Sequence, residues 1–310
     1  MSGSPSDMPP LLPPRRLPSA PDRLRALLAE GRLIVMPCCF DALSARLIEQ
    51  AGFPLSFMSG FATSAARLGL PDTGLATVTE MLEAGRAICD AVTIPVIGDG
   101  DTGHGNALNI RRTVQGFARA GFAAVMIEDQ QAPKRCGHVG GKQVVGRAEA
   151  VARIRAAVAA REAGDDILIL ARTDARTTHG LDEAIARARA FAEAGADILF
   201  VEAPESEDEM RRICTDAPGI HMANMLEGGR TPLLPPARLE ALGFAIAAYP
   251  LTLLSAAMKA MLRALEGLKA GAVPDDLLMD FAEIRRRIGF DAWLAAQARH
   301  AGKENEEERT

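Results

Sequence analysis

The chain repeats one short pattern of apolar and polar positions. Each unit begins with a short apolar run, continues through a polar or glycine-rich turn, and ends in a longer segment whose apolar residues are spaced as on one face of a helix. A short apolar run fits a strand buried on both faces, and the segment that follows fits an amphipathic helix. Eight runs have this form, at 33–36, 55–58, 94–97, 123–127, 167–170, 198–201, 220–223 and 244–247.

Helical patterns fill the intervals between these runs. We expect helices at 41–51, 78–91, 109–120, 147–163, 181–194 and 207–215 and, beyond the eighth run, at 251–270, 274–287 and 290–300. Gly52, Gly121, Gly164 and Gly195 follow four of them, as is typical of the position just past a helix end. Strands that alternate with helices pair in parallel, and eight such units favour a closed (β/α)8 barrel, a TIM barrel, over an open sheet.

The two ends of the chain differ from this repeat. Residues 1–21 are rich in Pro and Ser and lack an apolar signal core, which predicts a disordered lead-in. The barrel is expected over 22–270. Residues 271–302 carry apolar helical faces that one barrel does not need, so we expect them to pack on another subunit, and residues 303–310 form a charged tail.

Composition and charge narrow the classes of function. The 310 residues include 35 Lys and Arg against 40 Asp and Glu, a formal net charge of −5, without the basic face that nucleic acid requires. No uninterrupted apolar stretch is long enough to span a bilayer. The five cysteines include no CxxC pair, which argues against a zinc ribbon or a disulfide framework and favours a reducing cytoplasm. We therefore expect a cytoplasmic protein that binds a small molecule, with no nucleic-acid or membrane partner.

Polar residues follow the apolar runs where the strands are expected to end. They include several carboxylates and an arginine, which is more than the solvation of loops requires, although loop starts are commonly polar. Because the carboxyl ends of barrel strands converge on one face, we expect these side chains to form a functional pocket. They are Ser59, Gly60, Asp99, Asp101, Glu128, Arg172, Asp174, Glu202, Asn224 and Tyr249.

An acidic cluster within this set predicts a divalent metal site. Asp99 and Asp101 are two residues apart, Glu128 follows the neighbouring strand, and Asp72 can close the cluster from an earlier loop. Oxygen ligands, few of them direct carboxylates, suit Mg²⁺ or Mn²⁺ better than Zn²⁺.

A glycine-rich loop after the fourth strand carries a candidate proton donor. The segment Lys-Arg-Cys-Gly-His-Val-Gly-Gly-Lys at 134–142 places Cys136 between cations and beside His138. Nearby positive charge lowers the pKa of a thiol and makes its proton transferable, and the glycines allow the segment to fold over a pocket. A mobile surface loop with an incidental cysteine is the alternative. His138 fits a role in orienting this loop better than a role in chemistry.

Ordered motifs along most of the chain resemble the isocitrate lyase and phosphoenolpyruvate mutase superfamily. The likeness runs from about residue 25 to about residue 265. It is carried by Phe-Asp-Ala-Leu-Ser-Ala at 40–45, Leu-Gly-Leu-Pro-Asp at 68–72, Asp-Gly-Asp-Thr-Gly-His-Gly-Asn-Ala at 99–107, Ile-Glu-Asp-Gln at 127–130, Lys-Arg-Cys-Gly-His at 134–138, Ala-Arg-Thr-Asp at 171–174, Phe-Val-Glu-Ala-Pro at 200–204 and Ala-Asn-Met-Leu-Glu-Gly-Gly at 223–229.

The resemblance implies a fold, an assembly and a metal. The fold is a (β/α)8 barrel whose last helix is exchanged between subunits, usually in a homotetramer. By the family's pattern Asp99 binds Mg²⁺ directly, while Asp72, Asp101 and Glu128 hold its water ligands.

The resemblance also implies a substrate site and a proton donor. The oxo-acid end of the substrate is held by Ser59, Gly60, Phe61 and Arg172, and the far side of the site is lined by Glu202 and Asn224. Cys136 is the proton donor on the gating loop, and Glu128, Arg172, Lys134 and His138 complete the predicted catalytic set.

The thiol distinguishes branches of the superfamily. Members that cleave a carbon–carbon bond resemble this chain in Lys-Lys/Arg-Cys-Gly-His, whereas the phosphoenolpyruvate mutase and phosphonopyruvate hydrolase members carry a different loop. Retro-aldol cleavage of a 2-hydroxy acid gives an α-oxo acid and a carboxylate-stabilised carbanion, and a thiol can supply the proton that this carbanion needs. We therefore expect a Mg²⁺-dependent lyase that cleaves a substituted malate or a related 2-hydroxy dicarboxylate.

Two features limit this assignment within the family. His104 stands where relatives usually have Tyr or Phe. The run at 224–229 resembles the dimethylmalate lyase and petal-death-protein branch more than the methylisocitrate lyase branch, which favours a smaller dicarboxylate. The same scaffold supports oxaloacetate decarboxylation and carboxyphosphonoenolpyruvate phosphonomutation, and a binding module with a degraded site is the non-enzymatic alternative. A Schiff-base aldolase is disfavoured because no run ends in lysine.

Overall fold

The computed structural model describes residues 17–137 and 140–307, with side chains described up to residue 298. The chain divides into a unit that ends at Leu254 and a unit that begins at Ser255. Helix α1, Ala20–Ala29, begins inside the range predicted as a disordered lead-in, which corrects the end of that range. The helix starts there because the Ser19 side chain accepts a hydrogen bond from the backbone N–H of Asp22 and a proline occupies the first turn.

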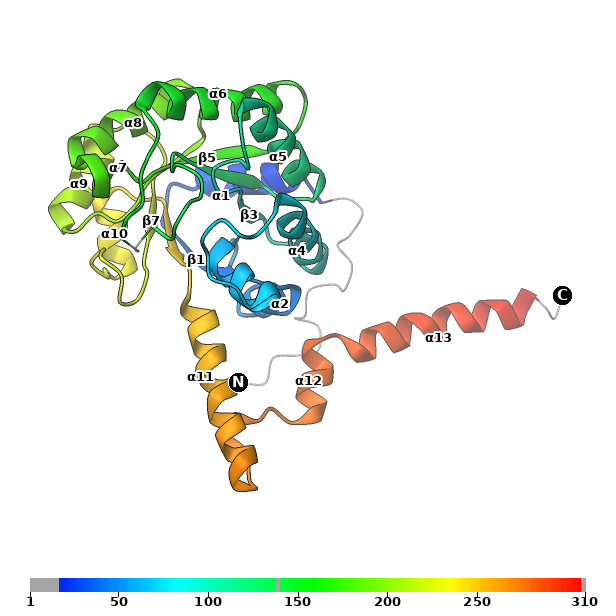
Figure 1. Ribbon diagram of the computed structural model, residues 1–310. Helices are drawn as coiled ribbons and strands as arrows, with labels where there is room; N and C mark the ends of the chain where they lie inside the picture. The colour runs from blue at the N-terminus through cyan, green and yellow to red at the C-terminus, as the bar shows by residue number, and fades with distance from the viewer. Residues whose placement is uncertain (1–16, 138–139, 308–310) are drawn as a thin grey trace. The chain divides into compact units, whose positions relative to one another are not determined.

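Eight parallel strands form the wall of the first unit (Figure 1). They are β1 Ile34–Cys39, β2 Ser56–Met58, β3 Val96–Asp99, β4 Ala124–Glu128, β5 Leu168–Thr173, β6 Ile198–Val201, β7 Met222–Asn224 and β8 Ile246–Tyr249. Neighbours pair in the order β6-β5-β4-β3-β2-β1-β8-β7, and a parallel bridge between Leu199 and His221 joins the two outer strands. The predicted (β/α)8 barrel is confirmed, while the exchange of its last helix stays a prediction.

All eight predicted runs form strands, and most of these strands extend further than the apolar run. β3 includes Asp99, β4 includes Glu128 and β7 includes Asn224. Backbone pairing continues past the last apolar residue, since Glu128 and Arg172 are register partners on β4 and β5. The side chains predicted at these strand ends are therefore fixed by the sheet itself.

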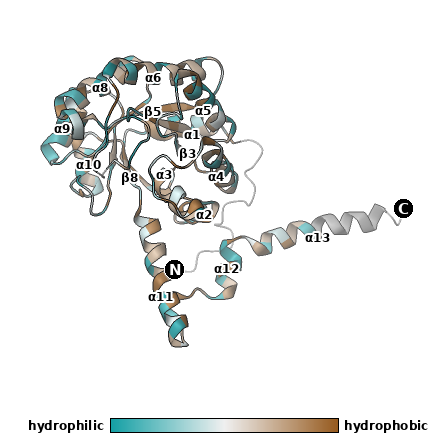
Figure 2. Ribbon diagram, viewed as in Figure 1, coloured by the Kyte–Doolittle hydropathy of each residue, from teal (hydrophilic) through white to brown (hydrophobic). Residues whose placement is uncertain are grey.

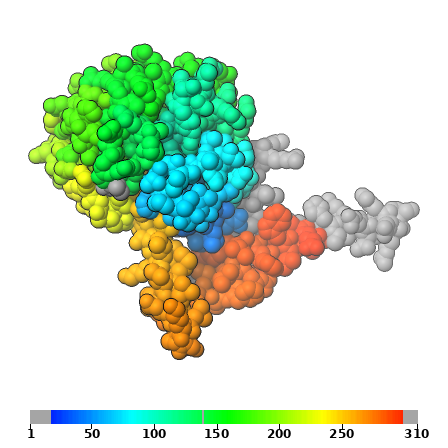
Figure 3. All heavy atoms as spheres, viewed as in Figure 1, coloured from blue at the N-terminus to red at the C-terminus, as the bar shows by residue number. Residues whose placement is uncertain are grey.

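Helices cover the outside of this wall (Figure 1), and in Figure 3 residues coloured cyan to green make up much of the face in view. Those at predicted positions are α2 Ala42–Gln50, α4 Val78–Ala91, α5 Ala107–Arg119, α6 Arg147–Glu162, α8 Leu181–Glu193 and α9 Glu207–Asp216. Capping boxes begin three of them, through Asp41 and Ser44, Thr77 and Glu80, and Asn106 and Asn109. The structure adds α3 Gly60–Thr63, a π-helical turn Ser64–Leu68, α7 Ala175–His179 and α10 Pro236–Leu242.

Alternate residues of each strand face opposite sides of the barrel wall. On β4, Val125 and Ile127 pack in the apolar layer beneath the helices, whereas Met126 packs inside the barrel. β5 follows the same rule, with Ile169 outside and Leu170 inside. Both faces of these strands are apolar, as the brown colour of β5 in Figure 2 shows. The period of two fixes which later side chains point inward.

The second unit consists of helices. α11, Thr252–Ala270, begins in the barrel unit, and α12 and α13 span Phe281–Arg287 and Phe290–Glu307. The predicted helix at 274–287 is corrected to a 3₁₀ turn, Asp275–Leu277, and a separate helix that begins where the Asp280 side chain caps the N–H of Glu283.

The predicted boundaries at the C-terminal end differ from those of the structure. The compact barrel unit ends at Leu254, the last buried residue of α11, whereas we predicted a barrel domain up to residue 270. Helix α13 runs through residue 300 into the predicted charged tail. None of the described helices combines the length and the apolar character needed to traverse a bilayer.

The second unit exposes many large apolar side chains. The exposed apolar residues of α11 recur every three or four residues, as on one side of a helix. Further exposed apolar residues lie in the segment after α11, in α12 and in the first half of α13. They are Met258, Met261, Leu262, Leu265, Leu268, Leu278, Met279, Phe281, Ile284, Ile288, Phe290, Trp293 and Leu294.

Candidate active site

The inward register of the strands continues from the apolar interior into a pocket at their carboxyl ends. On β4, Met126 lies in the interior and Glu128, two residues later, lines the pocket. On β5, Leu170 and Arg172 have the same relation. Because side chains alternate along a strand, the same period of two delivers the polar residues of neighbouring strands to one place. Three further polar residues reach the pocket from strand ends, namely Asp99 of β3, Glu202 after β6 and Asn224 of β7.

This pocket brings together most of the predicted site residues. It is lined by Ser59, Phe61, Asp72, Asp99, Glu128, Lys134, Cys136, Arg172, Glu202 and Asn224. Gly60 and Asp101 are not part of the lining but contact it through Asp99 and Lys134. His138 lies outside the described residues. Tyr249 ends β8 and does not line the pocket.

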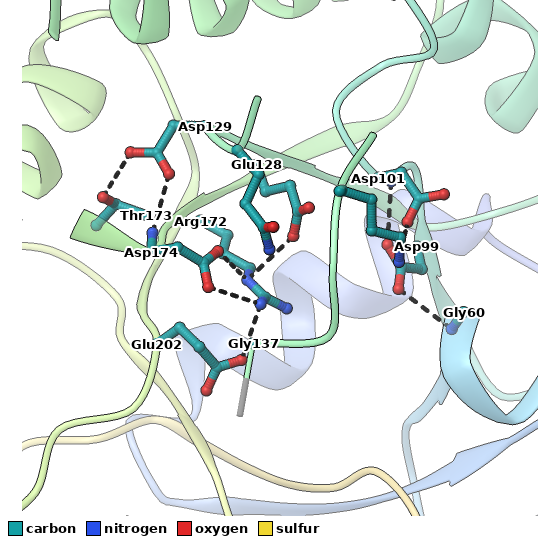
Figure 4. Close-up of polar contacts among 12 residues, drawn as sticks. Gly60, Asp99, Asp101, Glu128, Asp129, Gly137, Arg172, Thr173, Asp174 and Glu202 are labelled. Atoms are coloured by element: carbon teal, nitrogen blue, oxygen red, sulfur yellow. Dashed lines mark hydrogen bonds and ion pairs between the residues drawn. The ribbon is translucent and has the colours of Figure 1, made fainter. Parts of the chain in front are cut away.

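Arg172 is the centre of the polar network (Figure 4). Its Nε lies 2.8 Å from Asp174 Oδ2 and its Nη2 lies 3.0 Å from Asp174 Oδ1, a two-pronged contact. Nε is also 3.2 Å from Glu128 Oε2, and Nη2 is 3.2 Å from Glu202 Oε2. Burial lowers the pKa of the guanidinium, but Asp174, Glu202 and Glu128 outweigh this and raise it well above its ordinary value. Arg172 is therefore a permanent cation shared by three carboxylates.

The second part of the network is the acidic cluster around Lys134. Both oxygens of Asp99 accept backbone hydrogen bonds, from Gly60 N at 3.1 Å and from Asp101 N at 3.0 Å. The Nζ of Lys134 pairs with Asp72 and lies 2.6 Å from Asp101 Oδ1. Burial raises the pKa of Asp101 to about 7; Lys134 opposes the rise, and Asp99 and Asp72 add to it.

These carboxylates fit a hard divalent cation. The buried oxygen Glu128 Oε1 forms no hydrogen bond with any described residue, and Asp101 Oδ1 meets the ammonium of Lys134. Asp72 and Asp101 pair with this single ammonium. Burial lowers the pKa of the lysine, but Asp101, Asp99 and Glu128 outweigh this and raise it, so negative charge is in excess around it. Within the described chain no three acidic, imidazole or thiol groups converge tightly enough to hold a metal by themselves. Carboxylate oxygens suit a hard cation such as Mg²⁺, which keeps several of its waters.

Left-handed backbone lies beside two of these acids. Asp101 has φ 49° and Ala203, which follows Glu202, has φ 59°. Such values are uncommon outside glycine and persist where the surroundings enforce them. At Ala203 the backbone N–H donates to Glu202 Oε1 at 3.0 Å, and Asn224 Nδ2 lies 3.3 Å from both carboxylate oxygens of Glu202. The unusual backbone therefore helps to fix the carboxylate that meets Arg172.

The loop that carries Cys136 is folded against this network. Gln130 holds its first part, since its side chain donates to Arg135 O at 2.8 Å and accepts from Arg135 N at 3.0 Å. Cys136 is half-buried and, with Gly137, lines the pocket. A Cβ added to Gly137 would lie 2.6 Å from Glu202 Cγ, so only glycine allows this approach.

A supporting layer was missed in the sequence. Asp129 accepts hydrogen bonds from Thr173 Oγ1 at 2.6 Å, from Asp174 N at 2.9 Å and from Arg187 Nη1 at 2.9 Å. It thereby fixes the backbone that presents Asp174 to Arg172. The sequence shows only that a second acid, Asp129, directly follows Glu128. Its pairing with Arg187 of α8 joins residues far apart in the chain and has no local pattern.

His104, the residue that departs from the family's pattern, does not line the pocket. It is partly buried with φ 58°, and its Nε2 forms no hydrogen bond with the described residues. Burial lowers the pKa of its imidazole, which favours the neutral form.

A family model for phosphoenolpyruvate phosphomutase matches residues 24–269. The chain belongs to this family. 2,3-Dimethylmalate lyase of Eubacterium barkeri is 46% identical over 274 residues, which cover 87% of this chain and 94% of that protein. Chloroplastic carboxyvinyl-carboxyphosphonate phosphorylmutase of Arabidopsis thaliana is 44% identical over 292 residues, covering 91% of this chain and 85% of that protein.

Solved structures of family relatives share the fold. Oxaloacetate acetylhydrolase in complex with 3,3-difluorooxalacetate has a TM-score of 0.87 at 35% identity, covering 91% of this chain and 97% of that chain. Phosphonopyruvate hydrolase in complex with oxalate and Mg²⁺ has a TM-score of 0.81 at 32% identity, covering 92% of this chain and 100% of that chain. The predicted superfamily is confirmed.

Proposed function

We propose that this family member is a Mg²⁺-dependent lyase that cleaves the carbon–carbon bond of a substituted malate or a related 2-hydroxy dicarboxylate. The observation that carries the proposal is the place of Cys136, on a loop packed against Arg172 and Glu202 in the pocket that also receives the acidic cluster. A thiol there can deliver a proton to a carbanion formed beside a bound oxo acid.

The pocket suits a small dicarboxylate with an alkyl substituent. Arg172 provides positive charge, and Ser59 lines the same pocket and adds a hydroxyl donor, so together they suit a carboxylate and an oxo group. Leu226, Pro250 and Leu251 supply an apolar part of the lining. Contact between a methyl group and such a surface is favourable. A third carboxylate there would lose its hydration, which is costly. This chemistry, together with the 2,3-dimethylmalate lyase relative, favours a methylated malate.

Asp99 is the proposed direct ligand of Mg²⁺, or of Mn²⁺, with Asp72, Asp101 and Glu128 holding its waters. When bound, the cation supplies positive charge that polarises the 2-hydroxyl and the adjacent carboxylate of the substrate. Asp99 is oriented for this task because both of its oxygens accept backbone hydrogen bonds.

The proposed reaction moves two protons. The proton of the 2-hydroxyl leaves to a carboxylate of the cluster, and Glu128 is the candidate because its buried Oε1 accepts no hydrogen bond from the described residues. The bond between C2 and C3 then breaks, its electron pair stays on C3, and C2 becomes the carbonyl carbon of the oxo acid. Cys136 gives its proton to C3, while Lys134 and Arg172 hold the surrounding charges.

Turnover of defined substrates tests the proposal. Wild-type protein and Cys136→Ser are assayed with 2-methylmalate, 2,3-dimethylmalate, 2-methylisocitrate, isocitrate and oxaloacetate, and the release of pyruvate, glyoxylate or oxalate is measured. We expect wild-type cleavage of a methylated malate, and a loss of about 10²-fold or more in Cys136→Ser because a hydroxyl is a far weaker acid than a thiol. Cleavage that is unchanged in Cys136→Ser would remove the physical basis of the lyase assignment.

Two alternative functions are tested when carboxyphosphonoenolpyruvate is added to the same panel of substrates. Decarboxylation of oxaloacetate leaves pyruvate enolate, which water can protonate, so this rate would depend little on Cys136. The Arabidopsis relative makes phosphonomutation of carboxyphosphonoenolpyruvate the other alternative. A protein inactive on every malate but active on one of these substrates would take that function instead.

We further propose that the protein assembles as a homo-oligomer, a tetramer by the family's pattern, through the second unit. The support is the set of exposed apolar residues on α11, α12 and α13, because water-exposed apolar surface of this extent is unfavourable in a monomer.

A further inference from the structure

Lys142 is a buried lysine that the proposed mechanism does not use. Only 1% of its side chain is exposed, and its ammonium donates to Asp174 Oδ1 and to the backbone carbonyl of Gly137. Gly141, with φ 79°, turns the chain so that Lys142 points back toward Gly137. The lysine therefore ties the end of the loop to the segment that carries Cys136.

Asp174 links this lysine to the centre of the site. Its carboxylate accepts a hydrogen bond from Lys142. The same carboxylate forms the bidentate contact with Arg172 that Figure 4 shows. Burial raises the pKa of Asp174, but Arg172 and Lys142 outweigh this effect and lower it below the ordinary value, so the carboxylate stays ionised. The backbone N–H of Asp174 is in turn held by Asp129 at 2.9 Å.

Gly137 lies at the point where these contacts meet the pocket. Its carbonyl accepts from Lys142, and its Cα has no room for a side chain beside Arg172 and Glu202. The position of Gly137 fixes the position of its neighbour Cys136. A buried ammonium is costly unless every partner is in place, so the contact with Asp174 and the contact with Gly137 support each other.

We propose that Lys142 is a positioning residue that places the Cys136 thiol over Arg172 by holding the Gly137 carbonyl against the Asp174–Arg172 pair. It does not touch the substrate and transfers no proton. The inference rests on the proposed lyase function where it concerns turnover, but the placement of Cys136 is a property of the loop and can be measured without turnover.

The test compares wild type with Lys142→Met, Lys142→Arg and the control Arg111→Met, whose arginine is exposed on α5. Each is measured for kcat and KM on the preferred malate, for the rate at which iodoacetamide alkylates Cys136, followed by peptide mass, and for Tm. In Lys142→Met we expect kcat to fall about 10²-fold with KM changed less than about threefold, and Cys136 to react several-fold faster. Lys142→Arg keeps the charge but not the geometry. It should therefore lower kcat and raise the alkylation rate of Cys136 by smaller factors than Lys142→Met does.

A purely structural role predicts a different result, namely a lower Tm with wild-type kcat and wild-type alkylation in the protein that remains folded. That result in Lys142→Met overturns the inference, and if Lys142→Met does not fold, the same result in Lys142→Arg overturns it. If wild type cleaves no malate, the proposed function fails, while the alkylation rates still decide the role of Lys142.

Discussion

Replacing Gly137 with alanine adds a single methyl group at the closest contact between the loop and the site. The new Cβ would meet Arg172 Nη2 and would lie 2.6 Å from Glu202 Cγ, where an ordinary contact needs 3.4 Å, a shortfall of about 0.8 Å. Arg172 lies on β5 and is held by Asp174, and Glu202 follows β6 and is held by Asn224, so the loop must retreat.

A retreat of this size acts on catalysis more than on stability. A displacement of about 1 Å between reacting groups typically costs about 10²-fold in rate. We therefore expect Gly137→Ala to lower kcat about 10²-fold, with a Tm within about 2 °C of wild type because the loop adds little to the apolar core. Pyruvate release measures the first quantity and circular dichroism the second.

Gly140→Ala is the matched control within the same loop. A Cβ at Gly140 has no heavy atom of the described chain within 4 Å, so we expect nearly wild-type turnover. Wild-type kcat in Gly137→Ala would mean that the loop does not lie against Arg172 during catalysis, and equal losses in both variants would point to loop flexibility instead of the contact with Glu202.

Three further predictions concern the metal, the assembly and pH. Excess EDTA should abolish turnover and added Mg²⁺ should restore it, and Asp99→Ala should reduce the rate by at least about 10²-fold; full activity in chelator contradicts the metal site. Deletion of residues 274–310 should reduce the number of subunits found by light scattering and lower Tm. A monomeric full-length protein at micromolar concentration contradicts the assembly. The hydrogen bond from Arg147, with that from Arg187, lowers the pKa of Glu183 from 4.5 to about 2, although burial opposes the shift. Stability from this group is present above about pH 4.5 and is lost as pH falls through about 2, so between these values wild type should lose about 1 kcal/mol more free energy of unfolding than Glu183→Gln. Equal losses in acid titrations followed by circular dichroism would contradict this.

The fold could be predicted from the sequence because the patterns that specify strands and helices are local. A buried strand needs a short apolar run, and a covering helix needs an apolar face with a capped start, so the eight strands and six of the barrel helices lay where the pattern placed them. Helix α1 was missed because the proline-rich context outweighed the Ser19 cap, and the predicted helix at 274–287 was interrupted because a continuous apolar pattern does not reveal a new cap at Asp280.

The sequence also predicted many of the polar side chains that line the pocket. Acids and an arginine near the strand ends point inward because side chains alternate along a strand, which is a local rule. Several of the motifs that carry the resemblance to the superfamily include residues that line this pocket. A single sequence could therefore name Asp99, Glu128, Arg172 and Glu202 as one group.

Only the tertiary structure decided which of these groups meet. Arg172 is shared by Glu128, Asp174 and Glu202, which come from three neighbouring strand ends, and Lys134 joins Asp72 and Asp101 from separate loops. Lys142 reaches Asp174 only when the loop is folded. Such pairings depend on strand register and loop closure, which bring together residues far apart in the chain, and no local pattern of apolar and polar positions encodes those distances.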